Sequence, residues 1–157
     1  MKKFWFLFVL VLLVPVSSVY GHGLGLETIP ININDRKISI TTQIIPTEFS
    51  ESAQKQIVMT VTDSLTTQNV DSVLLIALYH KGEQVFQESF ATTNGILRMD
   101  VNPTDQPQIE ITGSKENGVW RATESEPLKI TGPILNSGGL YRFDVQIQSL
   151  DSEPLQN

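Results

Sequence analysis

The chain of 157 residues is long enough for one domain, and its 17 acidic and 11 basic side chains give a formal net charge of −6 at pH 7. It contains no cysteine, which excludes disulfide bonds, thiolate catalysis and thiolate metal sites. The acidic balance argues against binding of nucleic acid or of an anionic membrane surface, because both require basic patches.

The N-terminal segment has the order of charge and hydropathy that is typical of a secretory signal peptide. Lys2 and Lys3 precede an apolar run over residues 4–16, and small or polar residues follow as far as Gly21. This order predicts a signal-peptide helix that is cleaved before His22. The apolar run is shorter than the roughly 20 residues of a membrane span, so we expect membrane contact only if the segment stays uncleaved.

The remainder of the chain divides into one domain and a short tail. Residues 22–148 carry the apolar patterns described below, whereas residues 149–157 are polar. The expected organisation is therefore a signal peptide over 1–21, one domain over 22–148 and a frayed tail over 149–157. Cleavage of the signal predicts an exported protein that is extracellular or held at the cell surface.

The first half of the domain reads as a series of strands. Arg36–Ile45 alternates apolar and polar side chains, and Gln56–Asp63 repeats this pattern, which predicts strands with one face on a core. Val73–Tyr79 is apolar at every position, as is typical of a central strand. The turn at Lys81 joins it to Gln84–Ala91, so these two segments form a predicted β-hairpin.

The second half continues in the same way. Asn94 and Asn117 each precede a glycine and mark tight turns. The strands expected here are Ile96–Val101, Ile109–Thr112, Val119–Arg121, Leu128–Thr131 and Leu140–Gln148. Short strands separated by Gly, Asn and Pro turns, without a helical period, predict an all-β fold. We expect an immunoglobulin-like β-sandwich of about 7–9 antiparallel strands in preference to a barrel.

One segment strengthens the sandwich prediction. Gly138-Gly139-Leu140-Tyr141-Arg142-Phe143-Asp144-Val145 resembles the Gly-x-Tyr-x-hydrophobic-x-Val stretch that opens a late strand in immunoglobulin-like and fibronectin-type domains. The resemblance implies that Tyr141 is structural, with its ring in the core and its hydroxyl bonded to nearby backbone. Phe143 lies on the same inward face and is expected to be structural as well.

Both ends of the domain carry a second resemblance. His22-Gly23-Leu24-Gly25 and Ile29-Pro30 resemble the mature start of uncharacterised secreted or cell-surface β-sandwich proteins of ammonia-oxidising archaea. Thr131-Gly132-Pro133-Ile134, followed by Gly138-Gly139-Leu140-Tyr141, is similar to the end of their β domain. The resemblance implies a fold class and a surface location, and it supplies no catalytic residues. Many members of the group continue into a C-terminal membrane segment.

The two histidines form the first candidate metal site. Cleavage after Gly21 leaves His22 at the new N-terminus, where its amine and ring nitrogen can chelate copper. His80 is the second histidine of the chain and would complete a histidine brace. This predicts a copper carrier. In the alternative interpretation His80 is an exposed turn residue and His22 lies in a glycine-rich lead-in.

Asp100, Asn102 and Asp105 form the second candidate metal site. They place three oxygen donors in one loop, and calcium binds such clusters, so a calcium-stabilised adhesion module is a further hypothesis. Asp and Asn are also ordinary turn formers, and Pro103 restricts the backbone between the donors. A simple turn therefore remains the alternative.

Trp120 beside Arg121 is the candidate for ligand stacking, for a sugar or another flat ligand, with core packing of the Trp as the alternative. The sequence contains no nucleophile elbow and no phosphate-binding glycine loop. We therefore expect a non-catalytic exported module that binds or spaces something at the cell surface. We expect its partner to be an envelope protein, the surface layer or a polysaccharide. We expect no cofactor other than the copper or calcium of the two metal-site hypotheses.

Overall fold

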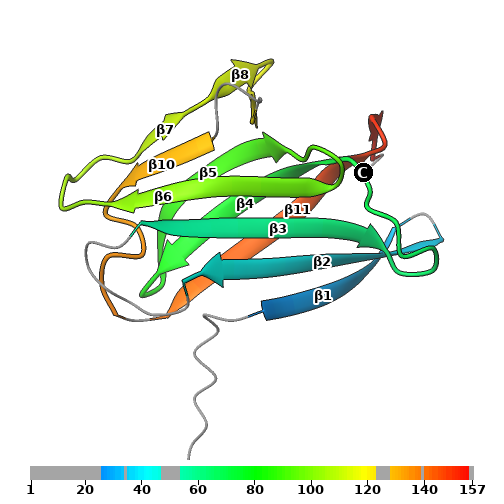
Figure 1. The fold of residues 1–157 in the computed structure, drawn as a ribbon, viewed down its shortest axis with the longest axis horizontal. Helices are drawn as coiled ribbons and strands as arrows, with labels where there is room; N and C mark the ends of the chain where they lie inside the picture. Colours follow the sequence, from blue (N-terminus) through cyan, green and yellow to red (C-terminus); the bar gives the residue numbers. More distant parts are fainter. Residues whose placement is uncertain (1–25, 34, 47–53, 123–127, 139, 156–157) are drawn as a thin grey trace, which may run out of the picture.

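The computed structural model describes residues 26–33, 35–46, 54–122, 128–138 and 140–155. These residues form two six-stranded sheets that pack face to face and contain no helix (Figure 1). The all-β sandwich predicted from the sequence is therefore confirmed. The signal-peptide helix expected over 1–21 lies outside the described residues. Within the described residues, no helix is long and apolar enough to span a membrane.

The first sheet has the strand order β1-β2-β3-β6-β10-β7. Neighbouring strands are antiparallel except β6 and β10, which are parallel. Its strands are β1 (Leu26–Ile33), β2 (Arg36–Ile45), β3 (Lys55–Asp63), β6 (Ile96–Pro103), β7 (Glu110–Thr112) and β10 (Leu128–Gly132).

The second sheet has the strand order β12-β11-β4-β5-β9-β8. Here β5 and β9 are parallel, and the other neighbours are antiparallel. Its strands are β4 (Ser72–His80), β5 (Glu83–Ala91), β8 (Ser114–Glu116), β9 (Val119–Arg121), β11 (Tyr141–Leu150) and β12 (Glu153–Pro154).

The structure differs from the sequence prediction in strand number and direction. The described residues hold twelve strands with two parallel pairs, where 7–9 antiparallel strands were expected. The prediction missed β1, which contains Pro30, and the very short β8 and β12. Proline is tolerated in β1 because this strand lies at a sheet edge. The strand β11 also continues to Leu150, beyond the expected domain end at 148.

The hydrophobic core lies between the two sheets, because each long strand turns alternate side chains inward. The alternation predicted for Arg36–Ile45 and Gln56–Asp63, with one face on the core, is confirmed. The largest fully buried side chains are Phe90, Ile38, Ile57, Met59, Leu74, Ile76, Leu78, Leu97, Met99, Leu128, Ile130 and Ile134. The strand β4 is central as predicted, with β11 and β5 on its two sides.

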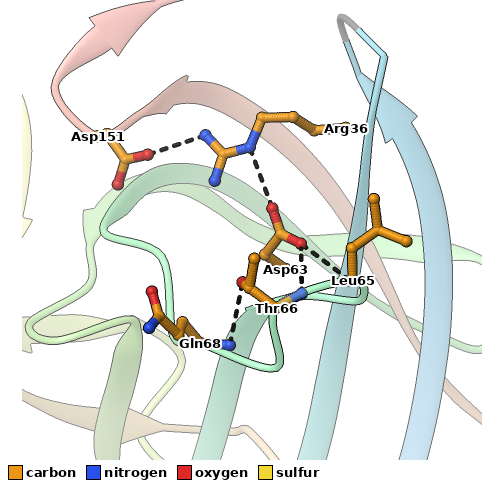
Figure 2. Close-up of polar contacts among 6 residues, drawn as sticks. All are labelled: Arg36, Asp63, Leu65, Thr66, Gln68 and Asp151. Atoms are coloured by element: carbon orange, nitrogen blue, oxygen red, sulfur yellow. Dashed lines mark hydrogen bonds and ion pairs between the residues drawn. The ribbon is translucent and has the colours of Figure 1, made fainter.

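An ion-pair network joins the two sheets at one end of the sandwich (Figure 2). Arg36, at the start of β2, donates from Nε to Asp63 Oδ2 at 3.2 Å and from Nη1 to Asp151 Oδ2 at 2.8 Å. Asp63 ends β3, whereas Asp151 follows β11 of the other sheet. Arg36 therefore links both sheets through its two carboxylate partners.

The turn after β3 holds the second oxygen of Asp63. Asp63 Oδ1 accepts the backbone N–H of Leu65 at 2.9 Å and of Thr66 at 3.1 Å, and the N–H of Gln68 in turn donates to Thr66 Oγ1 at 3.4 Å (Figure 2). The hydrogen bond from Thr66, that from Leu65 and the nearby Arg36 guanidinium together hold the pKa of Asp63 below its usual value. Asp63 is thus a buried carboxylate that is stabilised in its charged form.

Candidate functional site

A groove of about 820 Å³ opens between the two sheets, and we call it the inter-sheet groove. It lies on the side of the sandwich where β7 and β8 run, opposite the side of β1 (Figure 1). Its lining comes from the β4–β5 hairpin, from the segment around β7 and from two single residues. The lining residues are His80, Glu83, Gln84, Val85, Phe86, Gln87, Glu88, Pro107, Gln108, Ile109, Ile111, Trp120 and Pro133.

The groove exists because the chain closes only part of this side of the sandwich. Gly113 alone separates β7 of the first sheet from β8 of the second. Its φ of +147° and the 2.7 Å approach of Leu128 Cδ2 to a Cβ built there explain why glycine occupies the crossing. Beyond this crossing, β9 pairs with β5 only at Ser89 and Phe90. Among the described residues, the stretch of β5 before Ser89 has no strand on its groove side.

Glu88 is a charged residue in the lining of the groove. It lies on the same face of β5 as Phe86 and Phe90, so an inward position carries a carboxylate instead of an apolar group. Glu88 Oε2 accepts hydrogen bonds from Lys115 Nζ at 3.0 Å and from Trp120 Nε1 at 3.2 Å. These two donors, from β8 and β9, satisfy the carboxylate where the other sheet does not cover it.

Trp120 and Arg121 do not form one stacking surface. Trp120 is half-buried in the wall of the inter-sheet groove, with Lys115 Nζ 4.8 Å from its ring centroid. Arg121 is the next residue of β9 and lines a different hollow with Asp71 and Ser72, since successive strand residues face opposite ways. Lys115 lies over the Trp120 ring, and the indole N–H donates to Glu88. The ligand-stacking site stays a prediction.

His80 stands at the end of β4 in the wall of the groove. Its ring stacks on Tyr141 with centroids 4.2 Å apart and an interplanar angle of 3°. Its Nε2 atom is buried and has no hydrogen-bond partner in the described part of the chain. His22, the other half of the predicted copper site, lies outside the described residues, so the copper site stays a prediction.

The predicted calcium residues are only partly brought together. Asp100 and Asn102 lie on the same face of β6, and Asp100 Oδ1 accepts Gln56 Nε2 at 2.9 Å. Asp105 is exposed in the loop after the strand ends at Pro103. No group of three or more His, Cys, Asp or Glu side chains placed to hold a metal occurs in the described residues. The calcium site also stays a prediction.

Tyr141 and Phe143 pack against the core as expected for structural residues, but both are only half-buried. Sequence reasoning missed Glu88, Lys115 and the open edge of β5. A signal for Glu88 was present, because it alternates with Phe86 and Phe90 on an otherwise apolar face. The openness of β5 has no such signal, since it depends on where β9 and β7 lie.

The comparisons with known proteins place the chain in no group. No family model matches it, and no significant match was found among the curated proteins or among the solved structures.

Proposed function

We propose that the protein is a non-catalytic binding module that acts outside the cytoplasm, at the cell surface or in its surroundings. The observation that carries this proposal is the inter-sheet groove beside the unpaired stretch of β5. Ligand sites of proteins are usually concave clefts of about 300–1,000 Å³, and the volume of this groove falls in that range. The signal-peptide pattern of residues 1–21 supports export.

The groove favours an extended peptide as its ligand. The open edge of β5 offers backbone N–H and C=O groups that can pair with an added strand. Val85, Phe86, Ile109 and Ile111 contribute apolar surface that could receive alternate side chains of that strand. The Trp120 ring is occupied by Lys115, which disfavours sugar stacking. An envelope or surface-layer protein is therefore the partner that the geometry supports better than a polysaccharide.

We further infer an immunoglobulin-like type of sandwich. The β2–β3 and β4–β5 hairpins belong to different sheets, and the chain returns to the first sheet at β6. This alternation supports the inference, together with the late Tyr141 segment. The similarity of the chain ends to secreted proteins of ammonia-oxidising archaea supports the same surface role.

The test is selection of a phage-displayed library of unstructured peptides on the immobilised protein, with soluble polysaccharides screened in parallel. We expect selected peptides to bind the wild type and to lose binding to Ile109→Arg, which places a charge in the groove wall. Leu65→Arg is the matched control, because Leu65 is 73% exposed and lies outside the groove lining. Val85→Arg is a second groove variant if Ile109→Arg lowers the melting temperature.

Two outcomes contradict the proposal. Peptides that bind both groove variants as well as the wild type would place the binding surface elsewhere. Binding of polysaccharides alone would show that the partner class is wrong.

A further inference from the structure

The side chains of β11 become buried only near the C-terminal end of the strand. Phe143 and Val145 face inward but are half-buried, whereas Ile147 and Leu150 are 6% and 5% exposed. The strand β12 pairs with β11 only at Ser149 and Leu150, and the N–H of Leu155 donates to the Gln148 carbonyl at 3.0 Å. The inward side chains of β11 are therefore half-buried at Phe143 and Val145 and become buried towards the end of the strand that β12 covers.

The stretch Arg142–Ile147 is an open sheet edge. It pairs with β4 on one side, and no strand of the described residues lies on its other side. An open edge readily pairs with another chain unless proline, lysine or a bulge protects it. The edge strand of the other sheet, β1, carries Pro30. The open stretch of β11 contains neither proline nor lysine, and the irregularity in its pairing with β4, between Ile147 and Ser149, lies at its C-terminal end.

The charges on this edge are self-complementary. Arg142 and Asp144 lie on the outward face and pair with each other, Nε to Oδ1 at 3.0 Å, with 62% and 51% of their side chains exposed. Phe143 lies between them and points inward. If two copies of β11 pair antiparallel about a two-fold axis at Phe143, Arg142 of each copy lies opposite Asp144 of the other. Tyr141 then lies opposite Val145.

The same charges exclude the adjacent register. An axis at Asp144 would place two carboxylates opposite each other, and like charges directly opposite are destabilising. An axis at Val145 would bring Arg142 opposite Gln148, whose carbonyl already accepts the N–H of Leu155. The axis at Phe143 avoids both conflicts, and its paired stretch ends before the residues that β12 covers.

We propose that the protein forms a two-fold symmetric dimer by antiparallel pairing of its β11 edges, centred on Phe143. The pairing continues the second sheet from one copy into the other and covers the half-buried inward side chains of β11. Leu140, which is 69% exposed, lies opposite Gln146 of the second copy in this register. This surface is on the opposite side of the sandwich from the inter-sheet groove, so the proposal is independent of the peptide ligand.

Sedimentation velocity over a concentration series tests the dimer. The wild type is expected to change from monomer to dimer as its concentration rises. Arg142→Asp and Asp144→Arg are each expected to stay monomeric, because like charges then face each other twice across the axis. An equimolar mixture of the two variants is expected to dimerise, since every Asp then faces an Arg. Glu110→Arg, on the edge strand β7, is the matched control and should dimerise like the wild type.

At a concentration where the wild type is monomeric, circular dichroism should be the same for the wild type and both variants, because the altered side chains are exposed. Their melting temperatures should then differ only by the loss of the exposed Arg142–Asp144 pair and, in Arg142→Asp, of the contact between Arg142 and the Tyr79 ring. A wild type that is monomeric at every concentration overturns the proposal, as does a dimer that either single variant leaves unchanged. Mixing that fails to restore a dimer would show that the two side chains do not face each other.

Discussion

Replacement of Phe90 by alanine tests the position of the core most directly. Phe90 is 0% exposed, and its ring meets that of Phe86 edge-on, with centroids 6.4 Å apart and an interplanar angle of 76°. It sits in β5 opposite Leu74 of β4 and beside Trp120 of β9. Truncation of Phe90 to alanine therefore leaves a cavity in the core, against an interior strand of the second sheet, and removes the aromatic pair with Phe86.

The expected loss follows from this complete burial. Buried Phe-to-Ala changes cost about 3–5 kcal/mol, of which the aromatic pair accounts for about 0.5–1.5 kcal/mol. Tyr141→Ala is the matched comparison, because Tyr141 is half-buried at an open edge. Its loss should be on the order of 1–2 kcal/mol, in proportion to the smaller apolar area removed from water. If the Tyr141 ring were fully buried in the core, as the sequence analysis expected, Tyr141→Ala would lower the stability by more than this.

Urea denaturation of the purified proteins measures both losses. The midpoint should fall with an unchanged slope, because the surface exposed on unfolding is nearly the same. The melting temperature of Phe90→Ala should fall by about 9–15 °C for a domain of this size. The reasoning is refuted if Phe90→Ala costs less than about 1.5 kcal/mol, or if Tyr141→Ala costs as much as Phe90→Ala.

Three further predictions concern the charged and metal-binding groups. The pKa of Asp63 is lower in the folded state than in the unfolded chain, so its stabilisation is present above the unfolded pKa, about 3.9, and is lost as the pH falls through the folded pKa. Asp63→Asn should therefore destabilise the protein at neutral pH, with a difference from wild type that shrinks as urea titrations are moved toward pH 2–3; a difference that is constant with pH would contradict the role of its charge. If Asp100, Asn102 and Asp105 bind structural calcium, EDTA should lower the melting temperature and added calcium should restore it, whereas an unchanged melting temperature would reject this site. Mass spectrometry of the exported protein should find His22 at the N-terminus, and a copper brace requires tight stoichiometric copper binding that both His22→Ala and His80→Ala abolish; weak binding that survives either change would end the copper hypothesis.

Long strands could be predicted because their signal is local. Arg36–Ile45 coincides with β2, since ten residues of alternating polarity show which face is buried. The strand β1 has a comparable length but depends on its partner β2, and Pro30 within it is tolerated only at an edge. The strands β8 and β12 have three and two residues, too few to show any period.

The candidate site depends on contacts between distant segments. Trp120 and Arg121 are neighbours in the sequence, yet the alternation of β9 sends them to separate hollows. Glu88 meets Lys115 only because β8 and β9 return to the edge of β5. No sequence pattern within β5 reports where those strands lie.

The sequence alone therefore determined the signal-peptide pattern, the all-β class and the inward faces of the long strands, because charge order and side-chain period are properties of neighbouring residues. Only the tertiary structure decided the strand order, the two parallel pairs and the edges that remain open. These depend on which distant strands pair with each other. The open stretches of β5 and β11, on opposite sides of the sandwich, carry the two proposals.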